Sequence, residues 1–189
     1  SILLLCAASV TALPGRAENS IQPNVLLIIS DDQSWGDYSF LGHPHIKTPH
    51  LDKLAGESLT YSRGYVAAPL CRPSLASIFS GRHPHEHGIT GNDPRIQSGK
   101  KATRTNPELA PLYDTIMDRI DDEPGLAHLL GRAGYLSLQT GKWWEGDPKK
   151  RGGFTHAMTH GDPNRGGRHG DAGLKISRQG IKPITDFIA

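Results

Sequence analysis

The stretch "NVLLIIS" at residues 24–30, together with Asp31 and Asp32 that follow it, decides the fold predicted for this chain. It is a short, unbroken run of apolar and β-branched residues, without the alternation of polar and apolar side chains that marks a half-exposed strand. Such a run is typical of a strand buried on both faces of a parallel sheet. We therefore predict a buried strand over residues 24–30, with two carboxylates at its carboxyl end.

The segments that follow this strand alternate between helical and strand patterns. Helices are predicted over 48–58, 73–80, 109–120, 124–134 and 179–189, and strands over 59–68 and 135–143. Residues 91–104 and 149–173 are rich in turn or basic residues and lack periodicity, so they are predicted to be loops. The alternation of strands and helices predicts an α/β sandwich with a mostly parallel sheet.

The two ends of the chain indicate an exported protein that is seen in part. Residues 1–17 hold an apolar run followed by small and polar residues, which matches a signal peptide that is incomplete at its start. The apolar run is shorter than the roughly 20 residues that span a bilayer, so no membrane span is expected. Cys6 leaves a lipoprotein anchor as an alternative. The last helical pattern reaches Ala189 without a stop signal, so we expect residues 21–189 to be a fragment, secreted or periplasmic.

The composition restricts the partners of the chain. It is that of a globular domain, with 36% hydrophobic and 21% charged residues. The formal charge of +2 is too small to imply a nucleic-acid partner or a charged membrane surface. The basic stretches "KKATR" and "DPKKRGG" either steer a polyanion toward the protein or are simply solvated.

Asp31 and Asp32 are candidate metal ligands. Ligands of open α/β sheets collect at the carboxyl ends of the strands, where this pair is predicted to lie. Adjacent carboxylates repel each other unless a cation or protons intervene, and hard oxygen ligands suit Ca²⁺ or Mg²⁺. The alternative is that one Asp caps a turn and the other is solvated.

Cys71 lies in "APLCRPSLASIFSGRHPHEHG", residues 68–88, next to the predicted start of a helix at Pro73. Free backbone N–H groups at a helix N-terminus attract anions, and the same field lowers the pKa of a thiol. The cysteine is a nucleophile, a metal ligand, a modified residue, or an inert buried thiol. The residue alone does not decide among these.

Two further features carry possible chemistry. Lys142 in "TGKWW" follows the predicted strand 135–143 and either pairs with an anionic substrate or is solvated, while the two tryptophans are expected to pack in the core. The alternating histidines His83, His85 and His87 have residue types that bind zinc, but a metal also needs them to converge. We therefore favour a structural role for them.

These motifs, in this order, resemble the N-terminal part of the sulfatase family, a branch of the alkaline-phosphatase-like superfamily. The similar blocks are "PNVLLIISDDQSWGD", "TPHLDKLAGES", "APLCRPSLASIFSGRHPHEHG" and "GYLSLQTGKW". The resemblance extends from about Ile21 into the 140s. It implies an alkaline-phosphatase-like α/β/α sandwich, and a sulfatase that removes sulfate from a sulfated small molecule or glycan.

The resemblance also implies a set of site residues. Asp31, Asp32 and the group made from Cys71 would hold Ca²⁺, and Lys142 and Arg82 would bind the substrate. A formylglycine-generating or sulfatase-maturating enzyme would oxidise Cys71 to formylglycine. One hydroxyl of the hydrated aldehyde would attack sulfur and expel the alcohol. Loss of the proton from the other hydroxyl would then release sulfate and restore the aldehyde.

The chain departs from the family pattern in two places. Leu75 stands where the signature Cys-x-Pro-Ser-Arg has its Arg, which puts the modification and the full rate in doubt, although Arg72 offers a substitute charge. Trp144 stands where the family has His, and His156, His160 or His169 is a possible replacement. Further metal ligands are expected past Ala189, so the fragment alone should be inactive.

Two rival functions follow from the same residues. One is a phosphodiester or phosphonate-ester hydrolase, since the superfamily handles both sulfuryl and phosphoryl groups. The other is a catalytically silent relative that binds anionic glycans, which Leu75 and Trp144 motivate.

Overall fold

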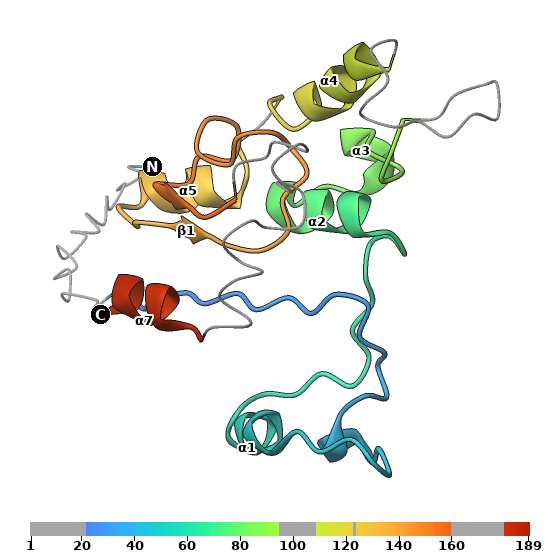
Figure 1. The fold of residues 1–189 in the computed structure, drawn as a ribbon, viewed down its shortest axis with the longest axis vertical. Coiled ribbons are helices and arrows are strands. Elements are labelled where there is room, and N and C mark those ends of the chain that lie inside the picture. The colour runs from blue at the N-terminus through green and yellow to red at the C-terminus, as the bar shows by residue number, and fades with distance from the viewer. Residues whose placement is uncertain (1–21, 95–108, 123, 160–179) are drawn as a thin grey trace, which may run out of the picture. The chain divides into compact units, whose positions relative to one another are not determined.

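The computed structural model describes residues 22–94, 109–122, 124–159 and 180–189. The chain divides into two compact units, Ser1–Lys53 and Leu54–Ala189, and each is described by itself. The expected signal peptide at residues 1–17 and most of the expected loop at 91–104 lie outside the described residues. Figure 1 shows the chain coloured from its N-terminus to its C-terminus.

Residues 24–30 are extended but belong to none of the strands in the described part of the chain. Their apolar side chains from Val25 to Ile29 are between 47% and 80% exposed, so the prediction of a buried strand is wrong for this structure. A strand is held by hydrogen bonds to its neighbours and by side chains packed on its faces. The described residues supply neither for this segment.

A short polar network organises the rest of the first unit. The 3-10 helix η1 (Ser39–Leu41) precedes α1 (Pro49–Glu57), which begins where the sequence predicts it. The Ser39 hydroxyl donates to Asp52 Oδ2 at 2.6 Å, and the Thr48 hydroxyl donates to Asp52 Oδ1 at 2.8 Å. These hydrogen bonds, first that of Ser39 and then that of Thr48, lower the pKa of Asp52. They join η1 to the first turn of α1.

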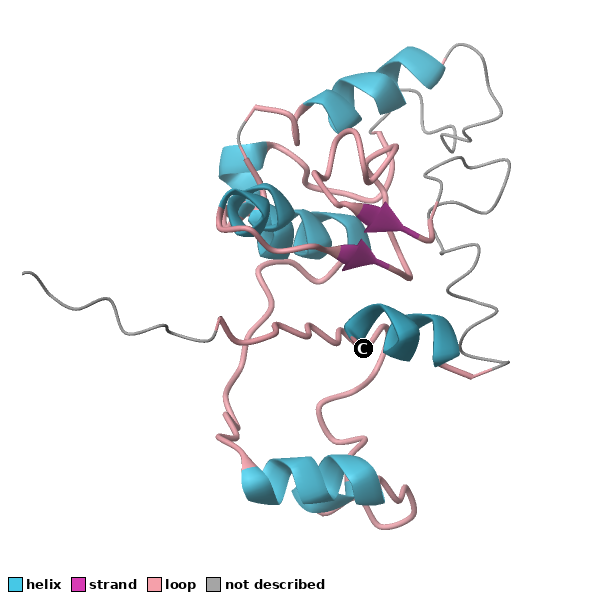
Figure 2. Ribbon diagram, turned by 90° about the vertical axis from the view of Figure 1, so that its left-hand side faces the viewer, coloured by secondary structure: helices cyan, strands magenta, loops and turns pink. Residues whose placement is uncertain are grey.

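The second unit is built around α2 (Cys71–Ser80) and α3 (Pro84–His87). α2 ends at Gly81, whose φ of 71° is the left-handed conformation that glycine adopts without a steric penalty. Figure 2 shows the helices of this unit beside its two short strands. The hydrophobic core is formed by residues of α2, of α5 (Leu126–Arg132) and of the loops between the helices and after the first strand. Its buried members are Ala76, Phe79, Ile89, Ile120, Ala127 and Trp143.

The sheet of the second unit is small and parallel. β1 (Leu138–Gln139) pairs with β2 (His156–Ala157), with Leu138 opposite His156 and Gln139 opposite Ala157. β1 confirms a strand within the predicted range 135–143, although it is shorter. β2 lies in the predicted loop 149–173, and that prediction is wrong there. The residues of β2 do not themselves indicate a strand, because β1, which pairs with them, lies 18 residues away along the chain.

The remaining helices follow the sequence pattern. They are α4 (Ala110–Asp118), α5 (Leu126–Arg132) and α7 (Lys182–Ile188). The segment 59–68, predicted to be a strand, is instead an exposed loop, with Tyr61 77% and Tyr65 89% exposed. It meets no neighbouring strand in the described residues, so its β-branched and aromatic residues have nothing to pair with. The described part of the chain therefore has helices and parallel pairing, which is the α/β character that the sequence predicts.

Candidate functional site

Cys71 is the first residue of α2, and the helix begins two residues before the predicted start at Pro73. Leu70 before it is extended, with φ −112° and ψ 148°. The Arg72 N–H donates to the Asn92 side-chain oxygen at 2.9 Å, and Pro73 has no N–H to offer. The expectation of several free N–H groups at this helix start is therefore corrected, because Asn92 already caps one and proline removes another.

Lys142 is presented by a tight turn at the end of β1. Gly141 has a φ of 81°, a conformation that side chains disfavour, so the turn requires glycine. The Gly141 carbonyl accepts hydrogen bonds from Gln139 Nε2 at 3.2 Å and from the Thr159 hydroxyl at 2.6 Å. Thr159 is buried and had not been identified from the sequence, because it follows β2 in a segment predicted to be a loop. These two bonds fix the backbone from which the lysine projects.

Cys71 and Lys142 lie side by side. The Lys142 ammonium donates to the Cys71 sulfur at 3.6 Å, across 71 residues of sequence. Both residues are partly buried. The structure thus brings the thiol and the cation together, as expected of two groups that act on one anion. Their catalytic roles stay predictions.

Arg72, the residue after Cys71, is fully buried and forms an ion pair with Glu145. Arg72 Nε donates to Glu145 Oε1 at 2.8 Å, and its NH2 group donates to Oε2 at 2.6 Å. A guanidinium held in this way does not reach toward a substrate. That Arg72 supplies the charge missing at Leu75 stays a prediction. Glu145 had not been identified, because its partner lies 73 residues away.

The two tryptophans after Lys142 belong to the interior, as predicted. Trp143 and Trp144 are 8% and 6% exposed. Trp143 packs edge-on against Phe79 of α2, with ring centroids 5.2 Å apart and an angle of 84° between the planes. Such edge-to-face contacts between aromatic rings are favourable. Trp144 is buried as well, which agrees with the expectation that both tryptophans pack in the core.

Arg82 lies just beyond the C-terminal end of α2, whereas Cys71 is at its beginning. A helix of this length separates them by about 15 Å along its axis. The Arg82 NH2 group donates to the Glu86 carbonyl at 3.4 Å, in the short helix α3. Contact between Arg82 and a substrate stays a prediction.

The side chains of His83, His85 and His87 do not converge on one site. The rings of His83 and His85 stack 5.7 Å apart in an exposed position. His87 is buried, where its Nδ1 accepts from the Ile89 N–H at 3.1 Å and its Nε2 bonds the Ser77 hydroxyl at 3.0 Å. Burial, followed by the positive charge of Arg82, lowers the pKa of His87. Both ring nitrogens of His87 are thus engaged within the fold, which supports the structural role.

Asp31 and Asp32 are exposed in the first unit, directly after residues 24–30. Asp32 has a φ of 54°, a left-handed conformation that Asp and Asn adopt more readily than most residues. Two adjacent carboxylates form a donor set that fits a hard cation such as Ca²⁺. The assignment of Asp31, Asp32 and Cys71 as metal ligands joins residues of both units and stays a prediction.

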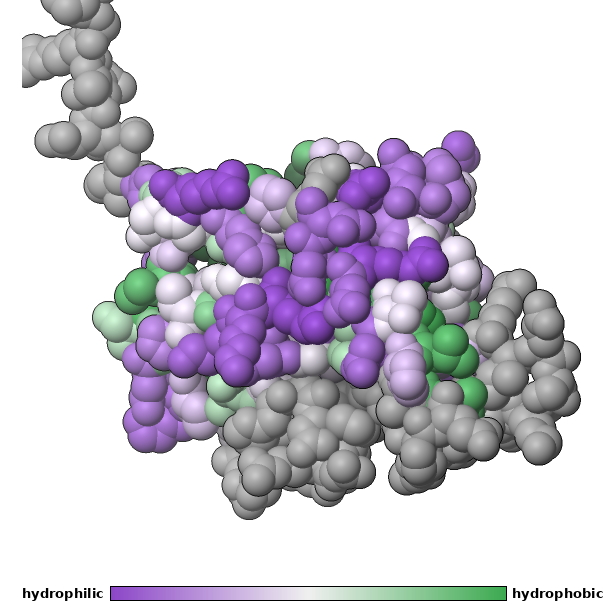
Figure 3. Space-filling model, turned by 90° about the horizontal axis from the view of Figure 1, so that it is seen from above, coloured by the Kyte–Doolittle hydropathy of each residue, from purple (hydrophilic) through white to green (hydrophobic). Residues whose placement is uncertain are grey.

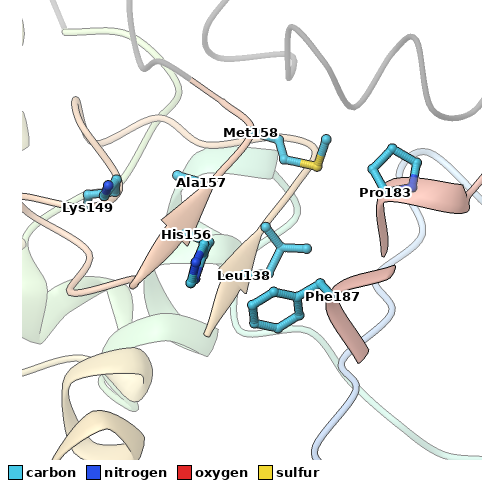
Figure 4. Close-up of a pocket in the computed structure, with 7 residues that line it drawn as sticks. All are labelled: Leu138, Lys149, His156, Ala157, Met158, Pro183 and Phe187. Atoms are coloured by element: carbon cyan, nitrogen blue, oxygen red, sulfur yellow. The ribbon is translucent and has the colours of Figure 1, made fainter. Parts of the chain in front are cut away.

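Of the three histidines suggested to replace the one at Trp144, His160 and His169 lie outside the described residues. His156 is in β2, where its ring lies edge-on to Phe187 of α7 at 5.2 Å. A hollow of about 350 Å³ opens there, shown in Figure 4, and is lined by Leu138, Lys149, His156, Ala157, Met158, Pro183 and Phe187. It includes neither Cys71 nor Lys142. His156 therefore has no contact that supports a role beside them.

The visible face of the protein in Figure 3 is mainly hydrophilic, with smaller hydrophobic areas. Among the described residues, none of the helices has the length and apolar character that crossing a bilayer requires.

Comparison with known proteins identifies the family. A family model described as Sulfatase matches residues 23–166. An N-acetylgalactosamine-6-sulfatase of Homo sapiens is 36% identical over 140 residues, which are 74% of this chain and 24% of that protein. Arylsulfatase D of Homo sapiens is 33% identical over 162 residues, which are 85% of this chain and 25% of that protein. The chain spans about a quarter of the length of these relatives. With Cys71 and Lys142 of the matched region lying side by side, we conclude that the chain belongs to the sulfatase family.

Proposed function

We propose that the full-length protein is a sulfuric-ester hydrolase that removes sulfate from an organic sulfate ester. The observation that carries the proposal is the hydrogen bond between Lys142 and Cys71, inside the region that matches the family. A cation beside the nucleophile stabilises the charge that develops on the sulfuryl oxygens during transfer. The start of α2, where Cys71 lies, adds a favourable helix dipole for the same anion.

We propose that Cys71 is converted to formylglycine by a formylglycine-generating or sulfatase-maturating enzyme. When formed, this residue supplies a hydrated aldehyde whose hydroxyl attacks sulfur. In the unmodified chain, the Cys71 sulfur stands for the oxygen of that group. Lys142 lies 3.6 Å from the sulfur. Its ammonium then donates a hydrogen bond either to this oxygen or to the sulfuryl group that the oxygen attacks. The hydrogen bonds to the Gly141 carbonyl fix the backbone from which this lysine projects.

A Ca²⁺ ion bound by Asp31, Asp32 and the group at residue 71 is part of the proposal. The ion would add positive charge where the sulfuryl oxygens gather. The carboxylates suit Ca²⁺ by their oxygen donors, and Mg²⁺ is the alternative. The proposed surroundings are the α/β/α sandwich of the alkaline-phosphatase-like superfamily, completed by further metal ligands from the rest of the protein.

The proposed substrate is a sulfated carbohydrate or an aryl sulfate. The names of the relatives include an N-acetylgalactosamine-6-sulfatase and arylsulfatases. Export from the cytoplasm, to a secreted or periplasmic location, is proposed from the pattern of residues 1–17. No nucleic acid is proposed as a partner.

Two measurements on the full-length protein test this function. The first is mass spectrometry of the peptide that holds Cys71, from protein made together with a maturating enzyme. The second compares hydrolysis of matched sulfate and phosphate monoesters and diesters, for instance of 4-nitrophenol. We expect the modified aldehyde, and a higher kcat/KM for the sulfate ester.

The outcomes separate the rival functions. A faster reaction with the phosphodiester or with a phosphonate ester would replace this proposal by the phosphoryl-transfer alternative. An unmodified thiol, with no turnover of any ester, would favour a silent relative that binds anionic glycans.

A further inference from the structure

We infer that the buried Arg72–Glu145 ion pair positions the reactive group at residue 71 against Lys142. This inference rests on the proposed function, because it gives the pair a role in that reaction. Arg72 and Glu145 act through the residues beside them and are positioning residues.

The ion pair and the candidate site share the same two segments of chain. Arg72 directly follows Cys71 in α2, and Glu145 lies three residues after Lys142. The guanidinium and the carboxylate make two parallel hydrogen bonds, of 2.8 and 2.6 Å. A fork of this kind fixes both the distance and the angle between two groups, which a single contact does not. Holding these two segments in register therefore also holds Cys71 at Lys142.

The burial of Arg72 and Glu145 indicates why charged residues occupy these two positions. The Arg72 side chain is fully buried and that of Glu145 is 5% exposed. Taking both charges out of water costs about as much as their attraction returns, and apolar residues of similar volume are often as stable in such places. Stability alone is therefore a weak reason for an ion pair here. A stronger reason for the ion pair is that it fixes the geometry between the two segments, because apolar side chains in contact prefer no particular angle.

Another contact between these segments lies farther from residue 71. Phe79 packs against Trp143, but it is eight residues after Cys71, or about 12 Å along the helix axis. A contact at that distance restrains the first turn of α2 less directly than a contact of residue 72 does. Asn92 adds to the local restraint, because its side chain accepts from the Arg72 N–H and so ties the first turn to the loop after α3. The ion pair involves the residue next to Cys71, so it lies nearer to the site than the contact of Phe79 with Trp143 does.

The first test separates positioning from stability in the full-length protein. The double variant Arg72→Met/Glu145→Leu replaces both charges by apolar side chains of similar size. We expect a Tm close to that of the wild type. We also expect kcat for the sulfate ester to fall about 100-fold with little change in KM, because a misplacement of about 1 Å costs that much. As a control, Ser77→Ala, in the same helix as Arg72, removes the hydrogen bond to His87 of α3 and should retain kcat.

The second test needs no turnover. In full-length protein made without the maturating enzyme, o-phthalaldehyde condenses with a neighbouring thiol and primary amine to a fluorescent isoindole, with loss of two molecules of water. We expect the wild type to form this product between Cys71 and Lys142, as peptide mass spectrometry will show. The double variant should form it about tenfold more slowly, since the reaction needs both groups in place. Cys71→Ser and Lys142→Met give the background.

The results decide the inference as follows. A double variant that keeps both the kcat and the isoindole rate of the wild type shows the pair to be structural only, and the inference is then wrong. A wild-type protein that forms no isoindole at Cys71 and Lys142 also overturns it. If the wild type forms the isoindole but hydrolyses no sulfate ester, the proposed function has failed, and a slower isoindole rate in the double variant still supports positioning.

Discussion

Lys142 donates a hydrogen bond to the sulfur of Cys71, although 71 residues separate them in the sequence. The contact joins the first residue of α2 to the turn after β1, and each side is fixed by its own local structure. Asn92 caps the start of the helix, and the left-handed Gly141 shapes the turn. The two groups that the proposed reaction needs are therefore held by the fold before any substrate arrives.

The first prediction concerns these two residues in the full-length enzyme. Cys71→Ala should abolish turnover, because it removes the precursor of the nucleophile, and Lys142→Met should lower kcat about 10²- to 10³-fold, because it removes one charge-stabilising donor. Both variants should keep the circular dichroism spectrum of the wild type. Lys150→Met, at an exposed lysine, is the matched control and should keep full activity. Retained turnover in Cys71→Ala would reject the assigned nucleophile.

The second prediction concerns the metal. Asp32→Asn should weaken Ca²⁺ binding in a calorimetric titration of the full-length protein, because it removes a negative charge while Asn tolerates the left-handed φ of 54°. Asp37→Asn removes a charge a few residues away, where Asp37 accepts the Ser34 N–H at 2.9 Å, and should leave Ca²⁺ binding unchanged. Equal titrations for wild type and Asp32→Asn would count against Asp32 as a ligand.

The third prediction concerns the stability of the buried ion pair. Glu145→Leu should reduce the free energy of unfolding by about 3–5 kcal/mol, because it leaves Arg72 as an uncompensated buried charge. Adding Arg72→Met should restore most of that loss. Asp186→Ala breaks the exposed pair with Lys182 in α7 and should cost at most about 0.5 kcal/mol. Urea denaturation measures all of these, and a loss in Glu145→Leu no larger than in Asp186→Ala would contradict the prediction.

The fourth prediction concerns the close approach of Phe79 to Gly125, at the start of α5. A methyl group on Gly125 would overlap the Phe79 ring, so Gly125→Ala should destabilise the protein by about 1–3 kcal/mol. Gly131→Ala, within α5 and facing open space, should instead stabilise it by about 0.5–1 kcal/mol, because alanine is the better helix former. Thermal unfolding of the two variants should shift Tm in opposite directions. The same shift in both would show that Phe79 does not pack on this glycine.

The fifth prediction concerns pH. The pKa of His87 is lowered by burial, so the unfolded state binds a proton at a higher pH than the folded state does. Neutral His87 therefore contributes its full stability above about pH 6.5, the pKa of histidine in the unfolded chain. This contribution is lost as the pH falls toward the pKa of His87 in the folded state. Its size is about 1.4 kcal/mol for each pH unit by which the fold lowers the pKa. Tm measured from pH 8 to pH 5 should fall more steeply for the wild type than for His87→Gln. Parallel curves would show that His87 is not the group responsible.

The helices were predictable because the interactions that form them are local. Each backbone hydrogen bond of a helix joins residues four apart, and the proline and glycine residues that begin and end it lie within the same segment. α1 accordingly begins where the sequence indicates, and α5 ends before Gly134, whose φ is 88°. The motif around Cys71 and the turn before Lys142 are local in the same sense.

The strands were harder to predict, because a strand exists only where another one pairs with it. The apolar run 24–30 has the composition of a buried strand and yet is exposed in this structure, whereas His156 and Ala157 form β2 within a segment that resembles a loop. Composition describes a segment, and pairing depends on residues elsewhere in the chain.

The sequence by itself determined the helices, the family motif and the candidates Asp31, Asp32, Cys71 and Lys142. Only the tertiary structure decided that Cys71 contacts Lys142, that Trp144 is buried, and that Arg72 pairs with Glu145. Side chains that meet across some 70 residues are brought together by the packing of α2 against the segment after β1. No local pattern records that packing, because its free energy comes from contacts between distant parts of the chain.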